Sequence, residues 1–225
     1  MTIRAVLFDL YETLVTERGL PIPRASALGG TLGVDAGAFR VAWRECRPLI
    51  VRGRLTFGDA LTDIGAHLGV AIDSGLVRRV CRERVQAKRL VLQRIDPDVL
   101  AVIGNLRSRN IRLGVVSNCF PEDVEAWPGC ALAPQFTTAV FSFTVGMAKP
   151  EPEIYVEAVR RLGVEPEAAL FVGDGADEEL TGAQRAGLRA ARAAWFVDAS
   201  ASHAESEAIP RVLEARGLMA LVAAG

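Results

Sequence analysis

The sequence predicts an α/β fold in which helices cover both faces of a mostly parallel β-sheet, with an all-helical segment inserted after the first strand. Three observations lead to this fold class. The apolar run Ala5-Val6-Leu7-Phe8 is typical of a parallel strand that is buried on both faces. Residues 20–92 carry a helical pattern without a convincing strand. From residue 96 onwards, short apolar runs alternate with helical patterns, as they do around a parallel sheet.

The inserted segment is predicted to be helical from its hydrophobic periodicity. In the first of its helices, apolar side chains recur at the spacing of one helix face, at Phe39, Trp43, Cys46 and Ile50. A second helix is expected around residues 58–68 and a third, rich in arginine, through residues 77–89.

Asp96-Pro97 is a helix-start signal, and the alternation of helix and strand begins there. The elements expected after it are helices over residues 98–109, 152–162 and 179–186, the last closed by Gly187, and strands over residues 111–116, 138–143, 169–172, 188–194 and 218–222. With a first strand over residues 4–8, they form a Rossmann-like sheet. We therefore expect an α/β core made of residues 1–16 and 96–225 and a helical cap made of residues 17–95.

Composition restricts the classes of partner. The formal net charge is −1, so no overall positive field is available to recruit nucleic acid or an anionic membrane surface. No stretch approaches the length of a membrane span, and the first residues lead into a strand rather than a signal peptide. The four scattered cysteines and two histidines indicate reduced thiols and disfavour a structural zinc site. We expect a cytoplasmic protein that acts on a small molecule, as a monomer or a homodimer.

Polar side chains stand where several of the predicted strands end. Asp9 follows the first strand, Ser117-Asn118 the second, and Asp174 lies between two glycines after a later strand. Lys149 precedes Pro150 and is one of only two lysines among the 26 basic residues. Because the carboxyl ends of parallel strands share one edge of a sheet, these groups can converge on Asp9. A buried carboxylate there is costly unless it is paired, metal-bound or used in chemistry.

With these motifs the chain resembles the haloacid dehalogenase-like hydrolase superfamily, in the subclass with a helical cap after the first strand. The resemblance covers essentially the whole chain, and its four signatures read Asp9-Leu10-Tyr11-Glu12-Thr13, Ser117-Asn118, Lys149-Pro150 and Gly173-Asp174-Gly175 with acids following. The resemblance implies that Asp9 is the nucleophile and forms a covalent aspartyl intermediate, which water then cleaves. It implies that Ser117 and Asn118 hold the transferring group, while Lys149 neutralises the charge developing on it and keeps Asp9 ionised.

The resemblance also implies a Mg²⁺ site, because a set of oxygen ligands suits a hard cation. The expected ligands are Asp9, the backbone carbonyl of Tyr11 and Asp174, with Glu179 bonding through a metal-bound water. Glu178 is the neighbouring alternative to Glu179, and Asp177 is interpreted as a cap of the following helix.

Tyr11 departs from the pattern of the family's phosphatases, in which the residue two after the nucleophile is a second aspartate. That aspartate protonates the leaving alcohol and later activates water, a role worth roughly 10²–10⁴ in rate. A tyrosine with an ordinary pKa of about 10 donates a hydrogen bond but is a poor base near neutral pH. We retain Tyr11 as a candidate catalytic residue, with Glu12 as the alternative.

Tyrosine at this position resembles the family's 2-haloacid dehalogenases instead, since halide needs no proton to leave. Trp43-Arg44 matches a Trp-Arg pair found early in the dehalogenase cap, whose arginine helps to accept the halide. Arg44 is therefore the candidate substrate-binding residue of the cap. Dehalogenases of this family are metal-free, however, and without a metal ion Asp9 and Asp174 would repel each other. The acids retained in the last signature therefore argue for Mg²⁺.

We expect Mg²⁺-dependent hydrolysis of a small phosphorylated metabolite through an aspartyl-phosphate on Asp9. Two alternatives stay open: a dehalogenase-type hydrolase that uses Asp9 without a metal, and a binding or regulatory protein with low activity. A resemblance at the level of the fold does not decide among them. The substrate is not identified, because it depends on the cap side chains that line the cavity.

Overall fold

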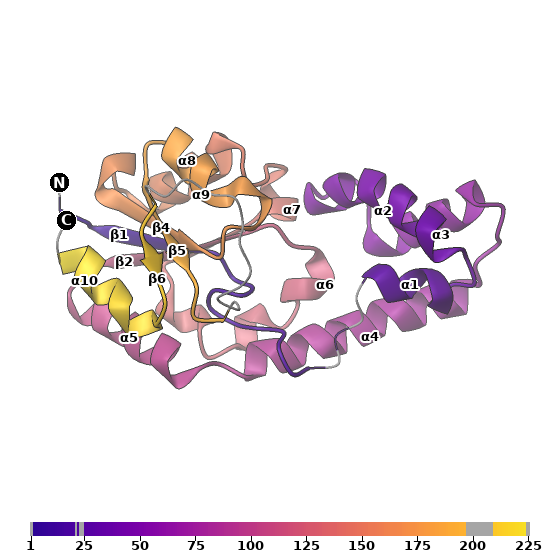
Figure 1. Ribbon diagram of the computed structural model, residues 1–225, viewed down its shortest axis with the longest axis horizontal. Coiled ribbons are helices and arrows are strands. Elements are labelled where there is room, and N and C mark those ends of the chain that lie inside the picture. The colour runs from indigo at the N-terminus through magenta and orange to yellow at the C-terminus, as the bar shows by residue number, and fades with distance from the viewer. Residues whose placement is uncertain (1, 21, 23–24, 197–208, 224–225) are drawn as a thin grey trace.

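The protein is built on one parallel sheet, which lies in the larger of the two lobes in Figure 1. The structure is a computed structural model that describes residues 2–20, 22, 25–196 and 209–223. Within these residues the sheet has six strands in the order β3-β2-β1-β4-β5-β6, and each neighbouring pair is parallel. The strands are β1 (Ala5–Phe8), β2 (Arg112–Ser117), β3 (Thr138–Phe141), β4 (Ala169–Gly173), β5 (Arg189–Ala193) and β6 (Arg211–Val212).

β1 lies in the middle of the sheet and determines the position of Asp9. All four residues of β1 are buried. Phe8 pairs with Val115 of β2 on one side and with Val172 of β4 on the other. The strand order reverses beside β1, since the chain runs outward to β3 on one side before it returns to β4 on the other. Open α/β sheets bind ligands in the crevice at such a switch point, so Asp9 emerges at the edge that binds ligands.

Helices cover both faces of the sheet (Figure 1). α8 (Pro152–Leu162) and α9 (Glu179–Arg185) bury apolar side chains against one face. α5 (Pro97–Ser108) and α10 (Leu218–Ala223) do so against the other face. Because both faces are buried, the central strands are apolar throughout, which is the pattern that predicted the fold.

A helical insertion separates β1 from α5, as predicted, and within the described residues it holds four helices, one more than the three expected. The helices are α1 (Ala25–Thr31), α2 (Ala36–Val51), α3 (Phe57–His67) and α4 (Ser74–Gln93). Each of the last three helices begins after an N-cap residue whose side chain accepts a hydrogen bond from a backbone N–H of the first turn. These residues are Asp35 for α2, Thr56 for α3 and Asp73 for α4. The insertion has an apolar cluster of its own, which Phe120 and Ala148 of the larger lobe join. We call this insertion the cap.

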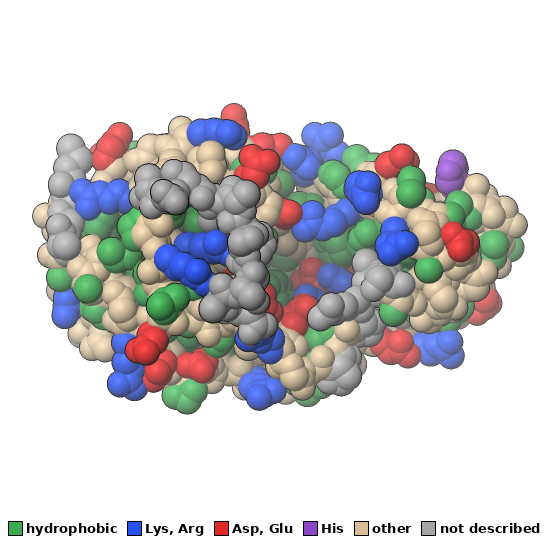
Figure 2. Space-filling view, viewed as in Figure 1, with side chains coloured by type: hydrophobic (Ala, Val, Ile, Leu, Met, Phe, Trp, Pro, Cys, Tyr) green, Lys and Arg blue, Asp and Glu red, His purple; other side chains and the backbone are tan. Residues whose placement is uncertain are grey.

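The cap lies beyond the carboxyl edge of the sheet (Figure 1). Two short helices of the larger lobe, α6 (Pro121–Val124) and α7 (Ser142–Val145), lie on the side that faces it. Figure 2 shows a hollow between the two lobes, in which basic and acidic side chains gather. The short 3₁₀ helices are η1 (Trp127–Gly129), η2 (Ala133–Gln135), η3 (Pro166–Ala168), η4 (Ala176–Glu178) and η5 (Ala215–Gly217).

Two sequence predictions are corrected by the structure. Residues 218–222 form α10 rather than a strand, with Leu218 and Val222 buried one helical turn apart. The predicted strand over residues 138–143 ends at Phe141, and α7 begins at Ser142. Short apolar runs fit a buried strand and a buried helix face equally well, so periodicity alone does not separate them. None of the described helices combines the length and the apolar character needed to cross a bilayer.

Candidate active site

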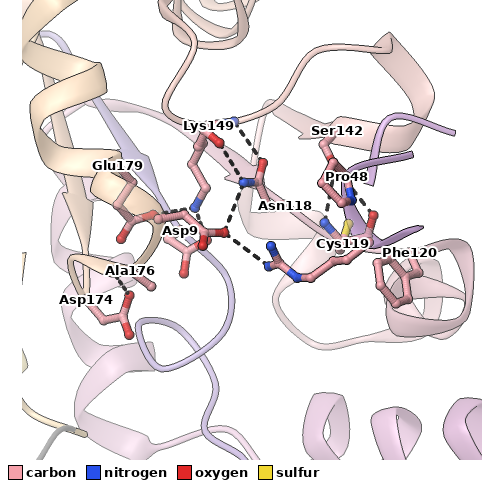
Figure 3. Close-up of polar contacts among 12 residues, drawn as sticks. Asp9, Pro48, Asn118, Cys119, Phe120, Ser142, Lys149, Asp174, Ala176 and Glu179 are labelled. Carbon is pink, nitrogen blue, oxygen red and sulfur yellow. Dashed lines mark hydrogen bonds and ion pairs between the residues drawn. The ribbon is translucent and has the colours of Figure 1, made fainter. Parts of the chain in front are cut away.

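The polar groups predicted at the strand ends lie at the carboxyl edge of the sheet, and Figure 3 shows Asp9, Asn118, Lys149 and Asp174 among them. Asp9 follows β1, Ser117 is the last residue of β2, Asp174 follows β4, and Lys149 lies shortly before α8. Their exposed fractions are 6% for Asp9, 1% for Ser117, 9% for Asp174 and 6% for Lys149. Polar groups buried this far need partners, and the partners define the site.

Lys149 connects two of the carboxylates. Its Nζ donates to Oδ1 of Asp9 and to Oε2 of Glu179 (Figure 3). Burial alone would lower the pKa of Lys149, but the carboxylates of Asp9 and Glu179 outweigh it and raise that pKa above its ordinary value. Lys149 is therefore held as an ammonium ion beside Asp9.

Asp9, Asp174 and Glu179 form an acidic cluster. One carboxylate oxygen from each lies within 4.8 Å of the others. Desolvation is the main cause that raises the pKa of Asp9, and it raises the pKa of Glu179 to about 8. Three buried carboxylates beside one ammonium, that of Lys149, carry an excess of negative charge, which a hard divalent cation relieves. The donor set therefore fits Mg²⁺, and the backbone carbonyl of Tyr11 stays a predicted ligand.

Glu179 belongs to this cluster, whereas its alternative Glu178 is exposed. Glu179 is 1% exposed, and its Oε1 accepts a hydrogen bond from the backbone N–H of Gly175 at 3.0 Å. The hydroxyl of Tyr155 donates to the backbone carbonyl of Glu179 at 2.7 Å. Asp177 and Glu178 both have left-handed backbone angles, with φ of 52° and 54°, directly before α9. This turn precedes the helix that places Glu179 inside the site.

Asp174 is held by Arg192, for which the sequence predicted no role. Its carboxylate accepts from the backbone N–H of Ala176 at 3.0 Å, and its carbonyl accepts from Nε of Arg192 at 3.2 Å. Arg192 is buried in β5, where it pairs with Gly173 of β4. The sequence does carry a signal for this contact. Arg192 is the single charged residue in the apolar run Ala190-Ala191-Arg192-Ala193, and a charged residue in a buried strand needs a buried polar partner.

Asn118 fixes the backbone that carries Lys149. Its Nδ2 donates to the Lys149 carbonyl at 2.9 Å, and its Oδ1 accepts from the Lys149 N–H at 2.8 Å. The same Nδ2 lies 3.4 Å from Oδ2 of Asp177. Asn118, predicted to bind substrate, is thus committed to positioning Lys149, while Ser117 beside it ends β2 at the same edge.

Tyr11 and Glu12, the candidates for the acid–base role, each have a partner already. The Tyr11 hydroxyl donates to the backbone carbonyl of Asp123 at 2.6 Å, and Nζ of Lys88 lies 3.8 Å from the centre of its ring. Burial is the main cause that raises the pKa of Tyr11 above its ordinary value. Glu12 accepts a hydrogen bond from the Thr16 hydroxyl and another from the backbone N–H of Glu17, both at 2.8 Å. Both side chains therefore have a structural contact at this end of the site.

Among the arginines of α2, Arg47 contacts the core beside the site, and the role of Arg44 in substrate binding stays a prediction. Arg44 is exposed on α2. NH2 of Arg47 lies 3.1 Å from Oδ2 of Asp177, across the gap between cap and core. Burial would raise the pKa of Asp177, but the guanidinium of Arg47 leads the contacts that lower it. Trp43 packs instead within the aromatic cluster of the cap, 5.8 Å from Phe57 between ring centroids.

A parallel sheet with a helical cap after β1, and a lysine-bridged acid cluster at its carboxyl edge, defines a haloacid dehalogenase-like hydrolase. Residues 3–187 match the model of the haloacid dehalogenase-like hydrolase family. The chain belongs to that family and is a hydrolase of it, as the resemblance implied.

Relatives in the family include phosphatases. The phosphoglycolate phosphatase of Aquifex aeolicus is 32% identical over 201 residues, which cover 85% of this chain and 85% of the relative. The glyceraldehyde 3-phosphate phosphatase of Methanopyrus kandleri is 39% identical over 95 residues, so the chain spans 40% of that relative's length. Among solved structures, the 2-haloacid dehalogenase of Pseudomonas syringae superposes with a TM-score of 0.68 at 24% identity and covers 99% of each chain, which supports the fold.

Proposed function

We propose that this hydrolase cleaves the phosphate ester of a small phosphorylated metabolite, with Mg²⁺ and through an aspartyl-phosphate on Asp9. The observation that carries the proposal is the cluster of Asp9, Asp174 and Glu179, with oxygens within 4.8 Å of one another, in which Lys149 bridges Asp9 and Glu179. Phosphatases among the relatives support the same substrate class. Binding Mg²⁺ to Asp9, Asp174, the Tyr11 carbonyl and, through water, Glu179 would supply charge neutralisation for the phosphoryl group.

The residues of the chain divide the reaction into two steps. In the first, a carboxylate oxygen of Asp9 attacks phosphorus, the bond from phosphorus to the ester oxygen breaks, and that oxygen takes its proton from solvent water. In the second, water attacks phosphorus, which releases inorganic phosphate and restores the Asp9 carboxylate. Lys149 holds Asp9 ionised and offsets negative charge on the transferring group, while the Ser117 hydroxyl and nearby backbone N–H groups hold its oxygens.

We further propose that residues 17–95 act as the cap of a core formed by residues 1–16 and 96–225. A small substrate would enter the hollow between the two lobes. Closing of the cap would then exclude water from Asp9 until the leaving group has departed.

Metal-free hydrolysis of a 2-haloacid is the second candidate, and Tyr11 is the observation that favours it. The residue two after the nucleophile is not an acid, and its hydroxyl is bonded to the carbonyl of Asp123. Halide leaves without a proton, so Asp9 alone would suffice as the nucleophile.

A panel of phosphate esters and 2-haloacids, each assayed with Mg²⁺ and with EDTA, separates these functions. We expect phosphate release with Mg²⁺ and at least about 100-fold less in EDTA, because a metal ion contributes several kcal/mol of charge stabilisation. The panel should include phosphoglycolate, phosphoserine and glyceraldehyde 3-phosphate. Release of halide from 2-chloropropionate that persists in EDTA would instead establish the dehalogenase reaction. Turnover of neither class at high enzyme concentration would indicate a binding or regulatory protein.

The dependence of kcat/KM on the leaving group tests whether a general acid acts beside Asp9. We expect 4-nitrophenyl phosphate to react roughly 10²-fold or more faster than ethyl phosphate, because nitrophenolate leaves without the proton that general acid catalysis would supply. The ratio of the two kcat/KM values measures this. Tyr11→Phe is the matched variant: it should change the ratio by less than about threefold, because the hydroxyl it removes is bonded to Asp123. Equal rates for the two esters would show that an acid operates.

A further inference from the structure

A cleft beside the candidate active site joins cap and core. Its volume is about 270 Å³, and its polar lining consists of Arg47, Arg52, Asn118, Lys149, Asp177 and Glu178. Two of these side chains belong to the cap: Arg47 lies on α2, and Arg52 is the residue that directly follows it. The cleft is thus the place where cap residues approach the lysine that contacts Asp9.

The cleft shares a wall with the catalytic centre. The amide Nδ2 of Asn118 donates to the backbone carbonyl of Lys149 at 2.9 Å and lies 3.4 Å from Oδ2 of Asp177. Arg47 contacts the same Oδ2 of Asp177 at 3.1 Å. The carboxylate of Asp177 and the amide of Asn118 therefore connect Arg47 to the backbone of Lys149, so a group held by Arg47 lies within the length of a small molecule from the reacting centre.

The guanidinium of Arg47 has N–H donors that make no hydrogen bond within the described residues, whereas Arg52 donates hydrogen bonds from both of its terminal nitrogens. Arg52 donates from NH1 to the carbonyl of Pro48 at 3.3 Å and from NH2 to Glu151. Within the described part of the chain, Arg47 has its contact through NH2 alone, and a guanidinium carries five N–H donors. The side chains of Arg47 and Asp177 are 44% and 39% exposed, and ion pairs this exposed stabilise a protein little. Arg47 is therefore free to bind another anion at small cost.

The charge balance of the cleft suits a monoanion. Of the three cationic side chains that line it, Lys149 is paired with Asp9 and Glu179 and Arg52 with Glu151, which leaves Arg47, whose partner Asp177 is part exposed, to bind an anion. A planar guanidinium matches a carboxylate with two parallel hydrogen bonds. A single carboxylate satisfies the charge as well as the geometry.

We infer that Arg47 is a specificity-determining residue that binds a carboxylate on the substrate, so that the preferred substrates are small phosphate esters that also carry a carboxylate group. This inference rests on the proposed phosphatase function. The contrary interpretation is that the Arg47–Asp177 pair only fastens the cap to the core. A fastening role would affect every phosphate ester alike, whereas a binding role discriminates between esters with and without the carboxylate.

The test compares phosphoglycolate with its neutral amide, 2-phosphoglycolamide, which has nearly the same shape and leaving group. We expect the wild-type protein to favour the acid by roughly 10- to 100-fold in kcat/KM, the range of a charge-assisted bidentate contact. Arg47→Gln should lower kcat/KM for the acid at least about tenfold, mostly through KM, and for the amide less than about threefold. Arg47→Lys, which keeps the charge but not the planar fork, should recover part of the discrimination.

Two controls make the result decisive. Arg40→Gln removes an exposed arginine from the same helix and should leave both kcat/KM values as in the wild-type protein. An equal loss for acid and amide in Arg47→Gln, or no discrimination in the wild-type protein, would overturn the inference while leaving the phosphatase function in place. Hydrolysis of 4-nitrophenyl phosphate by the wild-type protein with Mg²⁺ reports on that function separately, and its absence would overturn both.

Discussion

Replacement of Asp9 by asparagine is expected to lower kcat for phosphate-ester hydrolysis by at least about 10⁴-fold, because the amide cannot form the covalent intermediate. The fold should tolerate the change. The backbone N–H of Asp9 bonds to the carbonyl of Val172 at 2.9 Å, which the substitution leaves intact. The substitution also removes one charge from a crowded acidic cluster in which burial and Asp174 raise the pKa of Asp9. The measurement is kcat with 4-nitrophenyl phosphate and saturating Mg²⁺.

Asp98→Asn is the matched control for this experiment. Asp98 lies on α5, half exposed and paired with Arg216, so its loss should change kcat by less than about twofold. Acid-quenched single turnover with a radiolabelled phosphate ester should leave label on the wild-type protein and none on Asp9→Asn. A folded Asp9→Asn variant with wild-type kcat would rule out Asp9 as the nucleophile.

The order and direction of the strands were enough to predict three of the candidate site residues. Asp9, Ser117 and Asp174 stand at the ends of β1, β2 and β4, and parallel strands place all their carboxyl ends at one edge. No knowledge of side-chain packing was needed to bring them together. Glu179 was predicted from the resemblance, as an acid of the last signature with Glu178 as its alternative, and it lies at the start of α9 directly after that edge.

The cap arginine could not be predicted in the same way. Arg44 and Arg47 are three residues apart on α2, which separates them by only about 60° around the helix axis. Which of them reaches the core depends on how α2 docks. A Cβ on Gly53, just after α2, would lie 2.4 Å from the carbonyl of Phe143, so the end of the helix packs directly on α7. That contact between distant segments carries no signal in local periodicity.

The role of Tyr11 depended on long-range contacts as well. The sequence placed it two residues after the nucleophile, where an acid was expected. Its hydroxyl is bonded instead to the carbonyl of Asp123 on α6, and Lys88 of the cap covers its ring. Arg84 of the same cap helix contacts Asp123 at 2.6 Å. These contacts join residues far apart in the chain, 112 positions in the case of Tyr11 and Asp123, and only the folded chain shows them.

Lys149→Met is expected to cost both activity and stability. Loss of the cation that faces the transferring group should lower kcat by on the order of 10²–10³. Removing one partner of a buried ion pair typically destabilises a protein by about 3–5 kcal/mol, and Lys149 is the partner of both Asp9 and Glu179. The measurement is the free energy of unfolding in denaturant, with EDTA present.

The stability loss should depend on pH in a defined direction. Desolvation already raises the pKa of Glu179 to about 8, and removal of the lysine would raise it further. A carboxyl whose pKa is raised in the folded state binds its proton more tightly there, so its favourable contribution is present at low pH and is lost as pH rises through the folded-state pKa. The free energy of unfolding of Lys149→Met should therefore fall least below the wild-type value at pH 5 and most at pH 9. Added Mg²⁺ should restore part of this stability at high pH.

A second substitution separates this electrostatic cause from a packing defect. In the double variant Lys149→Met with Glu179→Gln, one of the two unpaired carboxyls becomes neutral, so much of the stability lost at pH 9 should return. Lys88→Met is the matched control, since Lys88 is the chain's other lysine and is also buried, against Glu17 and Asp123. It should lose stability too, but Glu179→Gln should not recover it, because the two sites share no partner. If Glu179→Gln fails to rescue Lys149→Met, or rescues both lysine variants equally, the acidic cluster does not have the excess negative charge on which the Mg²⁺ assignment depends.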